Sequence, residues 1–132
     1  MAEVRHLRLG GLEAPGAARD FVCSLAEQAY HDDALDEALR LVVSEVVTNS
    51  IRHGQVGDDG CVEIRVDVGP SRLRLEITDN GPGFVPDASP TPLDEPGGWG
   101  LYLVDSLTDR WGVEANGGTH VWLEMTPAAV AA

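Results

Sequence analysis

Three polar residues that can do chemistry follow one another at four-residue steps, namely Glu45, Asn49 and His53. On a helix this spacing places their side chains roughly along one face. A carboxylate can act as a general base, and an amide oxygen one turn later can bind Mg²⁺, a hard cation that prefers oxygen ligands. The same pattern is also typical of the solvated polar edge of an amphipathic helix.

A second candidate group consists of Asp79, Gly81 and Gly83, directly after a predicted strand. An aspartate at this place can accept a hydrogen bond from an exocyclic amine such as that of adenine. The glycines let the backbone approach a flat ring closely. A simple turn uses the same residue types, so this segment alone leaves both interpretations open.

Two further glycine-rich segments can contact a nucleotide. Gly98, Gly100 and Leu101 open a predicted helix, where free backbone N–H groups and the helix dipole favour an anion such as a phosphate. Thr119, which follows Gly118, can hydrogen-bond the edge of a base. Taken singly, the first segment also fits a loop-to-helix junction and the second a hairpin turn.

The elements that must position these residues follow from the periodicity of apolar residues. Helical spacing predicts helices at 14–30, 34–53 and 101–107. Alternation predicts strands at 4–9, 61–68, 72–78, 111–115 and 119–125, and the proline-rich residues 85–96 form a predicted lid. We therefore predict a single α+β domain over residues 1–132, a two-layer sandwich whose mixed, mostly antiparallel sheet carries helices on one face.

Composition excludes several classes of function. The chain has 132 residues and a net charge of −13, which argues against binding to nucleic acid or to an anionic membrane surface. All nine basic residues are arginine, so the lysine of a P-loop, of a eukaryotic-type kinase strand or of a Schiff base is missing. The chain shows no signal-peptide core and no apolar run of membrane-spanning length, so we predict a cytoplasmic protein.

Taken in order, these four weak motifs resemble the nucleotide-binding boxes of the GHKL ATPase superfamily, which has the Bergerat ATP-binding fold. Residues 44–53 resemble its N box, residues 79–83 its first glycine box, residues 98–101 its second and residues 118–119 its last. Within the superfamily the chain is similar to the stand-alone anti-sigma-factor serine/threonine kinases, because it has no room for a phosphoacceptor-histidine helical hairpin.

The resemblance implies ATP and Mg²⁺ as cofactors and a role for each motif residue. Glu45 would activate the hydroxyl of the acceptor serine, and Asn49 would hold Mg²⁺. Asp79 would bind the adenine amine with support from Thr119 and Gly83. The remaining predicted nucleotide contacts are His53, Gly81, Gly98, Gly100 and Leu101.

The resemblance also implies partners. The family's substrate is an anti-anti-sigma protein of the STAS fold, its other partner is a sigma factor, and a homodimer is suggested. One alternative is a nucleotide-dependent regulator without efficient phosphotransfer, because Gly98 and Trp99 stand where relatives often carry Arg or Lys. A fragment of a sensor histidine kinase is a third hypothesis.

Overall fold

The computed structural model describes residues 3–10, 14–53, 62–79, 100–115 and 118–127. In chain order the elements are β1 (Glu3–Leu9), α1 (Ala14–Tyr30), α2 (Asp33–His53), β2 (Val62–Val68), β3 (Leu73–Asp79), α3 (Gly100–Leu107), β4 (Arg110–Ala115) and β5 (Thr119–Met125). All eight predicted elements are present, and no bound differs from the prediction by more than one residue.

The strands form one five-stranded sheet in the order β1-β2-β3-β5-β4. Each neighbouring pair is antiparallel. The sequence predicted a mixed, mostly antiparallel sheet, and the described strands are all antiparallel to their neighbours. After β3 the chain passes through α3 and β4 before β5 returns beside β3. β4 thus runs in the same direction as β3, but β5 lies between them.

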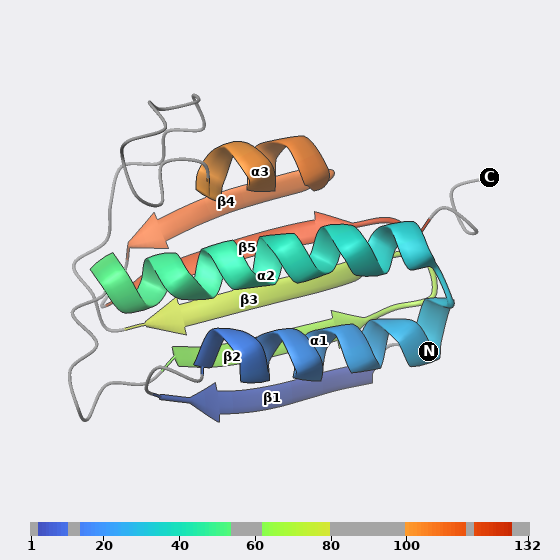
Figure 1. The fold of residues 1–132 in the computed structure, drawn as a ribbon, viewed down its shortest axis with the longest axis horizontal. Helices are drawn as coiled ribbons and strands as arrows, with labels where there is room; N and C mark the ends of the chain where they lie inside the picture. Colours follow the sequence, from blue (N-terminus) through green and yellow to red (C-terminus); the bar gives the residue numbers. More distant parts are fainter. Residues whose placement is uncertain (1–2, 11–13, 54–61, 80–99, 116–117, 128–132) are drawn as a thin grey trace.

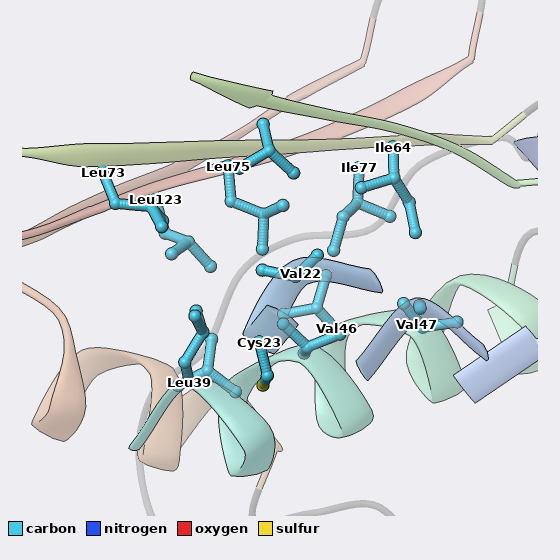
Figure 2. Close-up of a cluster of buried hydrophobic side chains, with 14 of the residues drawn as sticks. Val22, Cys23, Leu39, Val46, Val47, Ile64, Leu73, Leu75, Ile77 and Leu123 are labelled. Atoms are coloured by element: carbon cyan, nitrogen blue, oxygen red, sulfur yellow. The ribbon is translucent and has the colours of Figure 1, made fainter. Parts of the chain in front are cut away.

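The three helices cover one face of this sheet, with α1 over β2, α2 over β3 and α3 over β4 (Figure 1). The core lies between the two layers, where α1 and α2 face the strands (Figure 2). Its side chains include Val22, Leu39, Val46, Leu75 and Ile77, all fully or almost fully buried. Burial of each such side chain contributes about 1.5–3 kcal/mol, so this core fixes which side of each helix faces the sheet.

The corner between α1 and α2 is held by side chains at both helix ends. The Asp32 carboxylate accepts a hydrogen bond of 3.1 Å from the Leu35 N–H and so caps the N-terminus of α2. At the end of α1, the Tyr30 hydroxyl donates to the Gly69 carbonyl over 2.6 Å. This bond ties the helical corner to the turn between β2 and β3.

The opposite face of the sheet carries an ordered set of charged side chains. Glu124 is only 5% exposed, because Arg74 donates to its carboxylate over 2.9 Å and Arg72 donates over 3.4 Å. The Arg74 guanidinium also lies over the Trp122 ring, 4.7 Å from its centre. A Cβ at Gly112 would lie 2.6 Å from the indole nitrogen, so only glycine lets the ring lie across β4.

The Cys23 thiol gives the fold a specific dependence on alkaline pH. Burial in the core, and next the Asp36 carboxylate, raise its pKa from 9.0 to about 11. Above pH 9 the unfolded chain therefore loses a proton that the folded chain retains, so stability falls as pH rises through this window. We expect urea unfolding across the window to show a flatter pH dependence for Cys23→Ala than for the wild type.

A second variant separates the effect of the Cys23 thiol on stability from that of the Tyr30 hydroxyl. Burial also raises the pKa of Tyr30, which weakens the fold in the same direction at still higher pH. The Tyr30→Phe variant should therefore keep the loss of stability that begins at pH 9. An unchanged pH dependence in Cys23→Ala would contradict the assignment to Cys23.

Candidate nucleotide-binding site

Four elements bring their polar ends to one end of the molecule. The C-terminal end of α2, the end of β3 and the starts of α3 and β5 all lie at the left of Figure 1. These are the elements that carry the four motifs. The antiparallel arrangement produces this clustering, because β3 ends where β5 begins.

The centre of this region is a buried polar pair on neighbouring strands. Asp79 and Thr119 are partners in the β3–β5 register, and they are 3% and 2% exposed. Both residues continue the alternation of the buried positions Ile77 and Val121, so they face the helical layer. Both side chains already have a polar contact within the chain, and their buried polar groups at this end of the sheet can also recognise a polar edge of a ligand.

The second part of the site lies on α2. Glu45 is half-buried and Asn49 is 9% exposed one turn later, while Val46 and Val47 between them are buried in the core. Within the described residues neither Glu45 nor Asn49 has a side-chain hydrogen bond or ion pair. Their side-chain oxygens are therefore available to a ligand.

One residue beside the site was not found from the sequence. Arg19 on α1 donates a hydrogen bond of 3.0 Å to the Ser44 hydroxyl, directly before Glu45. It places a positive charge near the candidate base in a strongly acidic chain. No local pattern could have identified this residue, because the packing of α1 on α2 creates the contact.

The structure does not test every predicted contact. Gly81, Gly83 and Gly98 lie outside the described residues. His53 and Gly100 are described as parts of α2 and α3, but the surroundings of their side-chain positions are not described, and the same holds for Leu101. The nucleotide contacts of six residues therefore stay predictions: Gly81, Gly83, Gly98, His53, Gly100 and Leu101.

The described residues contain no preformed metal centre. No three His, Cys, Asp or Glu side chains in this part of the chain gather closely enough to hold a metal ion. None of the described helices is long and apolar enough to cross a membrane.

The described residues form a layer of helices on an antiparallel sheet with the buried polar pair at one sheet end, and a family model identifies the class of histidine-kinase-like domains. The family model described as the histidine kinase-like ATPase domain matches residues 12–125. The chain therefore belongs to the histidine kinase-like ATPase domain family.

Known proteins of two kinds are similar to this chain. Serine-protein kinase RsbW of Bacillus pumilus is 35% identical over 99 residues, which cover 64% of this chain and 61% of that protein. Anti-sigma F factor of Clostridium botulinum is 34% identical over 97 residues, which cover 66% and 68%. The chain thus spans less than two thirds of the first of these relatives.

Solved structures support the same fold. The RsbU and RsbW domains of a Mycobacterium tuberculosis protein match with a TM-score of 0.71 and 21% identity, over 95% of this chain and 32% of that one. The histidine kinase domain of a blue-light-activated kinase from Erythrobacter litoralis matches with a TM-score of 0.56 and 26% identity, over 74% and 46%. The first match concerns the fold alone.

Proposed function

We propose that this protein is an ATP-dependent serine/threonine kinase of the anti-sigma-factor kind. The observation that carries the proposal is that Glu45 and Asn49 lie one turn apart on the C-terminal half of α2, and that this helix ends at the same end of the molecule as the sheet end with the buried pair Asp79 and Thr119 (Figure 1). The names of the relatives support it, since they include a serine-protein kinase and an anti-sigma factor.

The proposed binding roles follow from the chemistry of each side chain. The Asp79 carboxylate accepts a hydrogen bond from the adenine amine, and the Thr119 hydroxyl supports the base edge. Asn49 supplies one oxygen to Mg²⁺, which is commonly held by few protein ligands together with substrate phosphates and water.

The proposed catalytic role belongs to Glu45. Bound Mg-ATP supplies the phosphoryl group, and the Glu45 carboxylate accepts the proton of the acceptor hydroxyl. General-base assistance of this kind is worth roughly 10²–10⁴-fold in rate, or about 3–5 kcal/mol of barrier. Half-burial keeps the carboxylate in reach of both the pocket and an approaching partner protein.

We further propose that the acceptor is a serine or threonine of a STAS-fold anti-anti-sigma protein and that a sigma factor is the second partner. The net charge of −13 supports a protein partner over direct binding to nucleic acid. With such partners and ATP as substrate, we expect the protein to act in the cytoplasm. The homodimer suggested by the resemblance stays a prediction.

The test is phosphotransfer from radiolabelled Mg-ATP to a STAS protein from the same organism. We expect an acid-stable phosphoserine or phosphothreonine on the partner, and none on the variant in which that residue is alanine. ATP binding without transfer to any candidate partner would favour the regulator without chemistry. An acid-labile phosphohistidine on another chain would instead favour the histidine kinase.

A further inference from the structure

Among the described strands, β1 forms one edge of the sheet and pairs with β2 alone. Figure 1 shows no described element on its outer side. An edge strand presents a row of backbone N–H and C=O groups that can pair with another chain. The opposite edge, β4, offers the same backbone groups and serves as an internal comparison.

The two edges differ in charge. β1 carries Arg5, His6 and Arg8, and these three side chains are exposed together with Val4, which is 44% exposed. β4 carries one arginine and one glutamate, so its charges cancel. With Glu3 included, β1 holds two arginines against one glutamate, so its formal net charge is +1 in a chain whose net charge is −13. Arg5 and Arg8 have polar contacts within the chain, but a guanidinium carries several donors and can bind a further carboxylate.

The open face beside β1 is hollowed. One hollow of about 300 Å³ is lined by His6, Leu7, Arg8, Glu63 and Ile64. A second, of about 270 Å³, shares His6 with the first and extends the depression across the sheet toward β5. Alternate side chains of a strand added to β1 would point to this face, so the hollow can receive one of them.

We propose that β1 is a docking edge that accepts an extended acidic segment of a partner protein as a sixth strand of the sheet. Backbone hydrogen bonds would provide affinity. Arg5 and Arg8 point to opposite faces of the sheet, so carboxylates on both faces of the added strand would provide selectivity. A second copy of this chain fits poorly, because paired β1 strands would bring like charges close together. The competing explanation is that the basic residues only protect the edge from aggregation.

The proposal is tested by fluorescence anisotropy without nucleotide, using labelled peptides of about eight residues, the length of a strand. The acidic probe repeats two glutamates followed by two valines, so that carboxylates point to both faces of the added strand, and a second probe has lysine in place of glutamate. A third probe has the charges of the first but proline at two valine positions, which removes backbone donors. We expect saturable binding of the first probe only.

Two variants with the same change in net charge locate the binding site. Arg5→Thr with Arg8→Thr should weaken binding of the acidic probe by about tenfold, the equivalent of about 1.4 kcal/mol. Arg40→Gln with Arg110→Thr, on α2 and β4, should leave the affinity unchanged. Circular dichroism checks that both variants are folded, and amide chemical shifts should change along β1 and not along β4.

Four results would overturn the proposal. Equal binding of the proline probe would show that charge alone attracts the peptide, and equal weakening by both variants would show that no edge is selected. No binding of the acidic probe, combined with aggregation of Arg5→Thr with Arg8→Thr, would establish the protective role instead. Self-association of the wild type through β1, seen in analytical ultracentrifugation, would identify a second copy as the occupant.

Discussion

Replacement of Glu45 by glutamine is expected to slow phosphotransfer roughly 10²–10⁴-fold, while the affinity for Mg-ATP stays near that of the wild type. Glutamine keeps the size and polarity of the side chain but cannot accept the proton of the acceptor hydroxyl. Because Glu45 is half-buried and unpaired within the described residues, the substitution breaks no ion pair there. Single-turnover transfer to the STAS partner, together with calorimetric titration of Mg-ATP, measures both quantities.

The matched control lies on the same helix. Glu37 precedes Glu45 by two turns of α2 and is exposed, so Glu37→Gln makes the same chemical change away from the site. We expect unchanged transfer and unchanged affinity in this variant. Normal phosphotransfer in Glu45→Gln would show that Glu45 is not the general base. A loss of ATP affinity that parallels the loss of transfer would show that Glu45 acts in nucleotide binding instead.

Replacement of Asp79 by asparagine is expected to weaken ATP binding about 10- to 100-fold. A hydrogen bond to a charged group contributes about 1.5–3 kcal/mol, and each 1.4 kcal/mol corresponds to a factor of ten. The pair with Thr119 is almost fully buried, so water cannot replace the lost carboxylate easily. Because guanine lacks the exocyclic amine of adenine at this edge, the preference for ATP over GTP should fall as well.

Two controls separate binding from folding. Asp67→Asn changes a strand aspartate on the opposite face of the sheet and should leave ATP affinity unchanged. Thr119→Val keeps the shape of the buried partner, and it should weaken binding by a smaller factor than Asp79→Asn. Wild-type ATP affinity in a folded Asp79→Asn protein would contradict the assigned role, and thermal unfolding without ligand shows how much of the change is lost stability.

The elements could be predicted from the sequence because apolar spacing follows burial in this fold. Leu39, Val43 and Val46 predict the buried side of α2, and the alternation in β2 and β3 matches their burial closely. The order of the strands could not be predicted in the same way. The position of β5 beside β3 depends on contacts between segments far apart in the sequence, for which periodicity carries no signal.

The candidate site, too, could be predicted from the sequence only in part. Glu45 and Asn49 could be identified from helical spacing and from the resemblance, and Asp79 from its place at the end of a strand. The contact between Arg19 and Ser44 could not, because it joins two helices. Glu124 is another example: alternation places it on the open face, where exposure would be expected, yet the surrounding arginines bury it.

The distance along the chain between β3 and β5 has a consequence for folding kinetics. Thr78 and His120 lie 42 positions apart and meet through a 2.9 Å hydrogen bond, one step from the pair Asp79 and Thr119. Such non-local contacts form slowly, whereas the β2–β3 hairpin closes locally. A ligand held by the late-forming pair stabilises the native state more than the folding transition state. Bound nucleotide would therefore prolong the lifetime of the folded chain without accelerating its formation.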